Sequence, residues 1–124
     1  MQNRPIPQVD VIEAHRRLTE PVAGEAAPIL VDVREVGEFV QARAVGAVLL
    51  PLSQFMGRYR ELPTDRPLLV ICAAGGRSTQ AAAFLLANGW DDVTNVIGGT
   101  VSWMASGLPA RSGPPAADEE DRGF

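Results

Sequence analysis

Residues 68–82 read Leu-Leu-Val-Ile-Cys-Ala-Ala-Gly-Gly-Arg-Ser-Thr-Gln-Ala-Ala, and this stretch carries most of the information about the fold. The apolar run that ends at Cys72 is typical of a buried strand. The pattern from Ser78 to Asn88 is typical of a helix, which Gly89 terminates. A strand that leads through a tight loop of small residues into a helix is a unit of α/β domains with a mainly parallel sheet.

The chain alternates in the same way on both sides of this stretch. We expect further strands at residues 29–33, 45–50 and 93–97, and further helices at residues 11–18, 35–42, 52–60 and 100–106. Asp10 and Glu13 have the spacing of a capping box at the start of the first helix. The prediction is one α/β domain over residues 1–110, followed by an acidic, Pro- and Gly-rich tail over residues 111–124 that we expect to be disordered.

The composition excludes several classes of function. The net charge is −4, and the acids at 118–121 account for much of it, so the body of the domain lacks the basic face of a nucleic-acid binder. The chain has no Lys, which excludes Schiff-base chemistry and a Walker-type phosphate loop. One Cys and one His exclude an internal disulfide and a Cys/His zinc cluster. We therefore expect neither a metal nor another cofactor.

The first twenty residues carry charges throughout and contain no apolar run long enough for a signal peptide or a membrane span. The longest apolar stretches, 45–50 and 68–74, have the length of buried strands. We therefore expect a cytoplasmic protein that has no membrane partner.

Cys72 stands at the carboxyl end of its predicted strand, which is where ligands bind in open α/β sheets. The small residues 73–76 allow the backbone to curl and to aim several N–H groups at one point. The helix start adds unpaired N–H donors and a partial positive charge. A thiol at such a position can have its pKa lowered to about 3.5–7.5, so the thiolate nucleophile is expected at neutral pH.

Two polar side chains extend this candidate site. Arg77 supplies a permanent cation that can hold an anionic substrate oxygen. Ser78 or Thr79 can cap the helix or donate a hydrogen bond to a bound anion. With Cys72 as the catalytic nucleophile, the candidate substrate-binding residues are Ala73, Ala74, Gly75, Gly76, Arg77 and Ser78.

The alternative interpretation of Cys72 is a buried structural residue, because Cys is among the most buried residue types. A structural Cys would not need two glycines and Arg77 directly before a helix start. We therefore favour the functional interpretation.

The segment from Cys72 to Arg77 resembles the active-site loop of rhodanese-like domains, in which a catalytic Cys opens a six-residue loop ahead of a helix. Three other segments are similar to signatures of that family, in the same order. They are Leu-Val-Asp-Val-Arg-Glu at 30–35 with Glu38-Phe39 after it, Gly-Ala-Val-Leu-Leu-Pro-Leu at 46–52, and Gly-Gly-Thr-Val-Ser-Trp at 98–103 with Gly107-Leu-Pro109 after it. The resemblance spans residues 8–110.

The resemblance implies a rhodanese-like fold, with an open, mainly parallel sheet of about five strands and helices on both faces. It also implies a thiosulfate sulfurtransferase. The Cys72 thiolate would take the outer sulfur of a small anionic donor such as thiosulfate, and the N–H groups from Ala73 to Ser78 would cradle it. Cyanide or a thiol, including a protein thiol, would then accept the sulfur, since the chain has no second Cys to resolve a persulfide.

The chain departs from the family pattern at two positions. Ala73 stands where many members carry a basic or polar side chain, which leaves one cation fewer at the loop. Arg43 stands where the middle signature often has His, and we expect it at the surface. Other residues are interpreted as structural: Asp32 and Arg34 as a buried pair, His15 as a surface residue, and Trp90 and Trp103 as core residues.

Two other functions remain open. A phosphatase or arsenate reductase of the same fold would have five residues between Cys and Arg, whereas four separate Cys72 from Arg77, which suits a single sulfur atom better. A non-catalytic module that uses the fold to bind a partner or sense sulfide would typically have lost the Cys, which this chain keeps.

Overall fold

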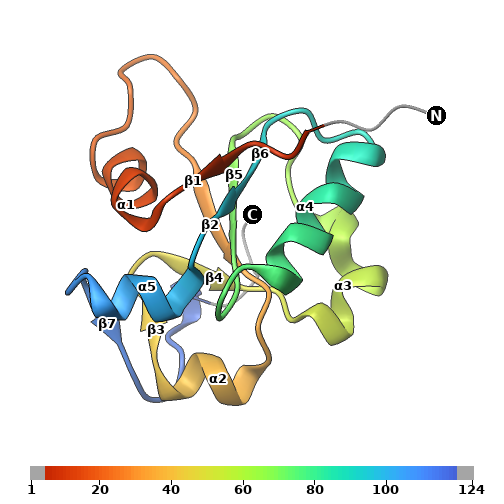
Figure 1. Ribbon diagram of the computed structural model, residues 1–124. Coiled ribbons are helices and arrows are strands. Elements are labelled where there is room, and N and C mark those ends of the chain that lie inside the picture. The colour runs from red at the N-terminus through yellow and green to blue at the C-terminus, as the bar shows by residue number, and fades with distance from the viewer. Residues whose placement is uncertain (1–4, 120–124) are drawn as a thin grey trace.

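A five-stranded sheet forms the centre of the computed structural model, which describes residues 5–119 (Figure 1). Its strands lie in the order β1-β6-β5-β2-β4, and each neighbouring pair is parallel. Their bounds are Gln8–Val9 for β1, Ile29–Asp32 for β2, Ala47–Leu49 for β4, Leu68–Ile71 for β5 and Val93–Val96 for β6. The α/β class and the parallel sheet are confirmed. The fifth strand is β1, whose two residues are too few for a recognisable sequence pattern.

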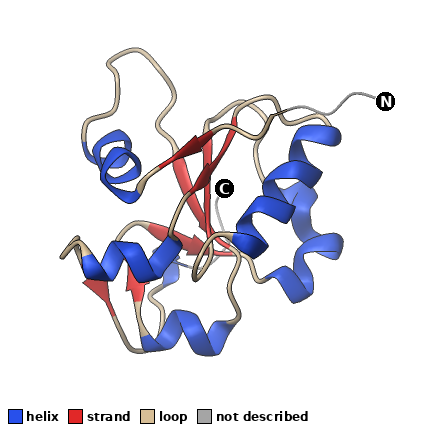
Figure 2. Ribbon diagram, in the orientation of Figure 1, coloured by secondary structure: helices blue, strands red, loops and turns tan. Residues whose placement is uncertain are grey.

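Helices cover both faces of the sheet, as predicted (Figure 2). Apolar residues of α1, α2 and α5 share one buried cluster with one face, and those of α3 and α4 share another with the opposite face. The bounds are Val11–Thr19 for α1, Val36–Gln41 for α2, Leu52–Arg58 for α3, Gly76–Ala87 for α4 and Gly99–Ala105 for α5. A short 3₁₀ helix, η1 (Tyr59–Glu61), follows α3.

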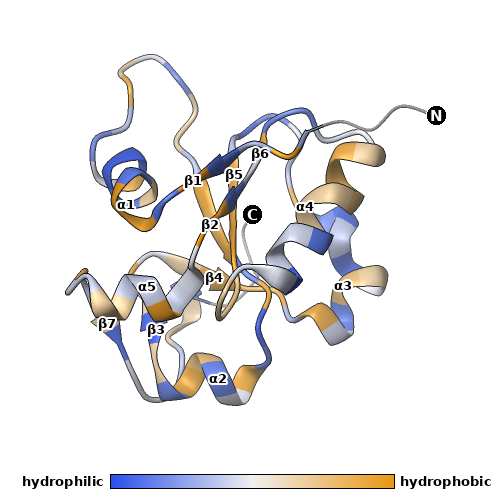
Figure 3. Ribbon diagram, in the orientation of Figure 1, coloured by the Kyte–Doolittle hydropathy of each residue, from blue (hydrophilic) through white to orange (hydrophobic). Residues whose placement is uncertain are grey.

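The central strands are buried on both sides, which explains their continuous apolar sequence. In β5, Leu69 faces α1 and Val70 faces α4, and both side chains are buried. Figure 3 shows β2 and β5 in the colour of hydrophobic residues between the more polar outer helices. Trp90 and Trp103 are buried, in agreement with the prediction that they belong to the core. No helix within residues 5–119 combines the length and the apolarity that crossing a membrane requires.

Two local expectations are wrong at the carboxyl end. Arg43 is 2% exposed rather than at the surface, and it forms an ion pair with Glu119 at 2.6 Å. The strand that contains it, β3 (Arg43–Ala44), pairs antiparallel with β7 (Ala110–Arg111). The chain beyond residue 110 is therefore ordered to residue 119, where the 3₁₀ helix η2 (Ala117–Glu119) ends. The expected disorder at 120–124 lies outside the described residues, and the domain boundary at 110 stays a prediction.

The first helix is capped by Asp10 as predicted, since its carboxylate accepts a hydrogen bond from the Glu13 N–H at 2.8 Å. The other half of the predicted capping box is not formed, because the Glu13 carboxylate binds Arg16 and Arg17 instead of the Asp10 N–H. In the same helix, His15 is half-buried rather than a free surface residue, because its ring packs edge-on against Trp103 with 5.6 Å between centroids. The partner lies on α5, which the pattern of α1 alone does not reveal.

Candidate functional site

Cys72 follows the carboxyl end of β5, and the loop after it curls back onto the sulfur. Gly75 has φ of 114°, a left-handed conformation that L side chains rarely adopt, and α4 begins at the next residue. This turn brings the Gly75 N–H to 3.0 Å from Cys72 Sγ and the Ser78 hydroxyl to 3.3 Å. Cys72 itself is 1% exposed, so its sulfur forms the floor of the loop.

These donors change the acidity of the thiol. Burial raises the pKa of Cys72, because a thiolate is poorly solvated there. Hydrogen bonds from the Ser78 hydroxyl and from the backbone N–H groups of Ser78, Gly75 and Ala74 act in the opposite direction and outweigh burial. The pKa of Cys72 is therefore lowered overall, which favours the nucleophilic thiolate.

The neighbouring turn, between β6 and α5, fixes the start of the Cys72 loop. The Thr100 N–H and hydroxyl donate to the Cys72 carbonyl at 2.8 and 3.1 Å, and the Val101 N–H donates to the Ala73 carbonyl at 3.0 Å. A Cβ at Gly99 would lie 2.6 Å from the Ala73 carbonyl oxygen, so only glycine permits this approach. The sequence analysis identified Gly98-Gly99 as a turn but missed that it supports the site.

Arg77 lies in the first turn of α4, directly after the loop, and is already paired. Its two terminal nitrogens bind the two carboxylate oxygens of Glu38 at 2.7 and 2.9 Å, in the bidentate geometry that favours Arg. The hydrogen bonds from Arg77 lower the pKa of Glu38 to about 2, and those bonds raise the pKa of Arg77. The sequence analysis quoted Glu38 only as part of a family signature and missed this contact.

A buried polar contact lies behind the sulfur. The Ser78 hydroxyl is 2.6 Å from Asn95 Oδ1, and the two residues are 0% and 3% exposed. Asn95 belongs to β6 and lies on the face that α4 covers, so the sheet and the helix together hold Ser78 below Cys72. Nothing in the sequence pattern distinguished Asn95 from other strand residues.

The remaining candidate residues occupy the outer side of the loop. Ala74 and Gly76 are exposed, and Ala73 is half-buried. Their part in binding a substrate stays a prediction. Asp32 and Arg34 form a buried pair at 2.9 Å, and Asp32 also accepts from the Arg34 N–H at 3.0 Å, as expected of structural residues.

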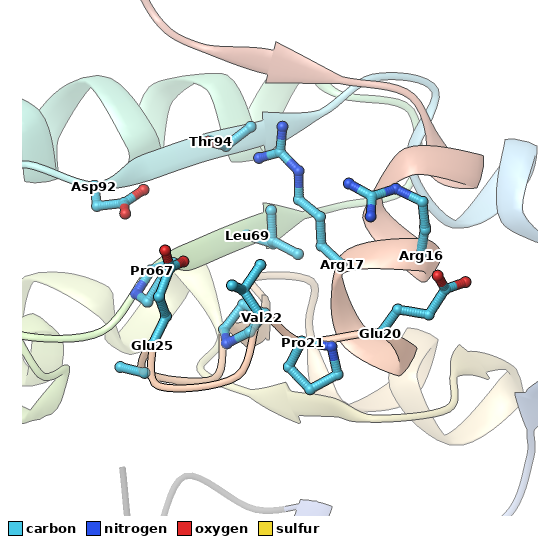
Figure 4. A pocket seen from close by; sticks show the side chains of 12 residues that line it. Arg16, Arg17, Glu20, Pro21, Val22, Glu25, Pro67, Leu69, Asp92 and Thr94 are labelled. Atoms are coloured by element: carbon cyan, nitrogen blue, oxygen red, sulfur yellow. The ribbon is translucent and has the colours of Figure 1, made fainter.

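A cavity of about 250 Å³ lies at the opposite edge of the sheet, at the amino ends of β5 and β6 (Figure 4). Leu69 and Thr94 lie on the sheet side of this cavity, and Arg16 and Arg17 reach over it from α1 (Figure 4). Both guanidinium groups bind Glu13. Because parallel strands run from this edge towards Cys72, the cavity is separate from the candidate site. Within residues 5–119 no cluster of His, Cys, Asp and Glu has the makeup of a metal site.

These features define a class of protein: an α/β domain with a cysteine held among hydrogen-bond donors at a strand-to-helix turn. The sequence model of the rhodanese-like domain family matches residues 13–106, so the chain belongs to that family. The expected resemblance is thereby confirmed.

Relatives and solved structures agree with this assignment. The chain is 36% identical to a protein named "Sulfurtransferase" of Allochromatium vinosum, over 74% of this chain and 86% of that protein. It is 40% identical to the thiosulfate sulfurtransferase GlpE of Actinobacillus succinogenes, over 65% of this chain and 73% of that protein. The crystal structure of a rhodanese-related protein from Thermoplasma volcanium matches with a TM-score of 0.75 and 27% identity, covering 85% of this chain and 97% of that one.

Proposed function

We propose that this protein is a sulfurtransferase, which moves a sulfane sulfur from a small anionic donor such as thiosulfate to a thiophilic acceptor through a persulfide on Cys72. The ring of donors around Cys72 Sγ, with the Gly75 N–H at 3.0 Å and the Ser78 hydroxyl at 3.3 Å, is the observation that supports it. A sulfur atom added to Sγ carries negative charge, and such donors stabilise it. The names of the two curated relatives support the same class of reaction.

The proposed reaction has two displacements. In the first, the Cys72 thiolate attacks the outer sulfur of thiosulfate, a new S–S bond forms to Sγ, and the old S–S bond breaks with its electron pair on the departing sulfite. In the second, cyanide or a thiol attacks the terminal sulfur, and the electron pair of the breaking bond returns to Sγ. Thiocyanate or a new persulfide leaves. The acceptor comes from outside, because Cys72 is the only Cys in the chain.

The loop residues have separate roles in this proposal. The small residues Ala73, Ala74, Gly75 and Gly76 leave room for the donor, and the backbone N–H groups as far as Ser78 cradle the transferred sulfur. Arg77 attracts the anionic part of the donor while Glu38 holds its guanidinium in place. Four residues between Cys72 and Arg77 make a loop for one sulfur atom, which speaks against a phosphatase or an arsenate reductase.

The test is the intact mass of the wild type and of Cys72→Ser after thiosulfate and then after cyanide. We expect the wild type to gain one sulfur atom and to lose it to cyanide as thiocyanate, and Cys72→Ser to gain none. If the wild type gains nothing from thiosulfate, mercaptopyruvate is the next donor to test. Hydrolysis of an aryl phosphate would instead indicate a phosphatase, and inactivity in every assay would indicate a binding module.

A further inference from the structure

The Ser78 hydroxyl faces more acceptors than it has protons. It carries one proton, while Asn95 Oδ1 lies 2.6 Å away, the Gly75 carbonyl oxygen 3.2 Å and Cys72 Sγ 3.3 Å. Ser78 and Asn95 are both buried, so the arrangement is fixed by the protein rather than by bulk water. Next to a neutral thiol, the shortest contact, with Asn95 Oδ1, should take the proton, and a lone pair of Ser78 Oγ would then face the sulfur. The Ser78 hydrogen bond that lowers the pKa of Cys72 requires the opposite direction, with the O–H pointing to the thiolate.

Asn95 is able to reverse this arrangement. A side-chain amide has an oxygen that accepts and a nitrogen that donates. In the orientation shown, the amide nitrogen has no hydrogen-bond partner within residues 5–119, so turning the amide breaks only the contact with Ser78. After the turn, the nitrogen donates to Ser78 Oγ, and the Ser78 proton is free to point at Cys72 Sγ.

We propose that Asn95 is a positioning residue that sets the direction of the Ser78 hydroxyl according to the protonation state of Cys72. With the neutral thiol, the Cys72 S–H donates to Ser78 and the Ser78 O–H donates to Asn95 Oδ1. When the thiol loses its proton to solvent, the chain of hydrogen bonds reverses, and the Ser78 O–H stabilises the thiolate. The inference rests on the proposed function only because the thiolate is the form that attacks a sulfur donor.

The charged groups around the sulfur are held in ion pairs. Arg77 interacts electrostatically with Cys72 and is paired with Glu38, and Asp32 at the end of the neighbouring strand is paired with Arg34. The sequences of β6 and α5, which also pack here, contain no charged residue. The pKa of Glu38 is held at about 2 and that of Arg77 is raised, so this pair keeps its charges between about pH 5 and pH 9, where a change of the hydrogen bonds follows the thiol.

The test is the pH dependence of the rate at which iodoacetamide alkylates Cys72. In Asn95→Val the Ser78 hydroxyl loses the group that turns it towards the thiolate, so we expect alkylation at about pH 6 to be roughly threefold to tenfold slower. Ser78→Ala should show a similar loss, and the double variant should lose no more than Ser78→Ala alone, because both residues act through one hydroxyl. The control is Thr94→Val, a neighbouring buried position on the opposite face, which should alkylate like the wild type.

A lower melting temperature with an unchanged alkylation profile in Asn95→Val would make Asn95 merely structural and would overturn the proposal. Losses that add in the double variant would also contradict it. Should Asn95→Val not fold, NMR of the wild type decides: the side-chain amide signals of Asn95 should shift at the midpoint of the Cys72 titration, and a constant signal refutes the inference. Alkylation needs no sulfur donor, so this result is independent of whether thiosulfate loads the protein.

Discussion

The turns that follow β5 and β6 are built in the same way but bind different groups. In each turn, the last residue before the helix is a glycine with positive φ. The value is 114° for Gly75 and 79° for Gly98. The N–H groups of the first turn point at the sulfur of Cys72. The N–H groups at the start of the second helix, from Thr100 and Val101, bind two backbone carbonyls of the first turn.

This difference shows how a loop of very small side chains is held in place. Residues 73–76 offer little side-chain packing of their own, so the fixed geometry comes from the neighbouring turn. With the first two carbonyls of the loop bound by α5, their lone pairs point away from the thiolate, and the next N–H groups point towards it. The β6–α5 turn is therefore a support for the β5–α4 turn rather than a second site.

Gly99→Ala should have the largest effect, because it removes the support that the β6–α5 turn gives to the β5–α4 turn. The added Cβ would lie 2.6 Å from the Ala73 carbonyl oxygen, and Gly99 has φ of 58°. We expect the free energy of unfolding to fall by about 2–5 kcal/mol and sulfur loading to be nearly lost, because α5 must move away from the loop. Urea unfolding and intact mass after thiosulfate measure the two effects. Wild-type loading in a folded Gly99→Ala chain would show that the loop keeps its shape without α5.

Gly75→Ala should have the next largest effect, and Gly76→Ala is its matched control. A Cβ at Gly75 meets only the Gly98 nitrogen, at 3.8 Å, so the strain comes from φ of 114° and costs about 1–2 kcal/mol of stability. Relief of that strain would turn the Gly75 N–H away from Sγ, so alkylation of Cys72 near neutral pH should slow. Gly76 has an ordinary φ and open space, and its replacement should leave stability and alkylation close to wild type. Equal effects at both positions would contradict the role assigned to Gly75.

Thr100→Val tests the support with a smaller change. Valine keeps the shape of the buried side chain and removes the hydroxyl that donates to the Cys72 carbonyl at 3.1 Å, while the backbone N–H bond at 2.8 Å remains. We expect a loss of about 0.5–1.5 kcal/mol in the free energy of unfolding and about half or more of the loading rate retained. Complete loss of loading would mean that the hydroxyl, rather than the helix backbone, holds the loop.

The first of these turns could be predicted from the sequence, and the second only in part. The apolar run before Cys72, the two glycines and the helical pattern after Ser78 are local signals, and each was confirmed within one or two residues. The support by Gly99 depends on two parallel strands lying side by side, which no local pattern reports. Asn95 was missed for the same reason, since its partner Ser78 is seventeen positions away.

The errors at the carboxyl end also come from contacts between distant segments. Arg43 and Glu119 are separated by 76 positions. Arg and Glu are mostly found at the surface, so the sequence alone favours an exposed position for each. Together they form a buried ion pair, and burial of either charge alone would be unfavourable. The periodicity of apolar residues does not reveal an ion pair between such distant positions. The acidic tail was therefore expected to be disordered.

The smallest expected effect on stability concerns Arg77, the cation next to the Cys72 loop. Glu38→Gln tests it by removing the charge of its partner. The hydrogen bonds from Arg77 hold the pKa of Glu38 at about 2, below the ordinary 4.5, so this pair stabilises the fold fully above about pH 4.5 and less as the pH falls towards 2. Glutamine still accepts the hydrogen bond from the Glu35 N–H, but it has no charge and therefore no pH-dependent contribution to the free energy of unfolding. Because the pair is a third exposed, we expect a loss of about 0.2–1 kcal/mol at neutral pH and a flatter acid limb of the stability profile in urea unfolding.

The same substitution decides what Arg77 does in the loop. Because Glu38 holds the Arg77 guanidinium in place for the donor, Glu38→Gln should raise the KM for thiosulfate by about twofold to fivefold while transfer to cyanide stays the same. Glu61→Gln is the control, since Glu61 also binds an arginine but lies on the exposed surface of η1. An unchanged KM in Glu38→Gln would show that Arg77 does not bind the donor and that its role is to hold α2 against α4 through Glu38. The two turns would then differ only in what their backbone N–H groups bind, with no side-chain cation needed for the donor.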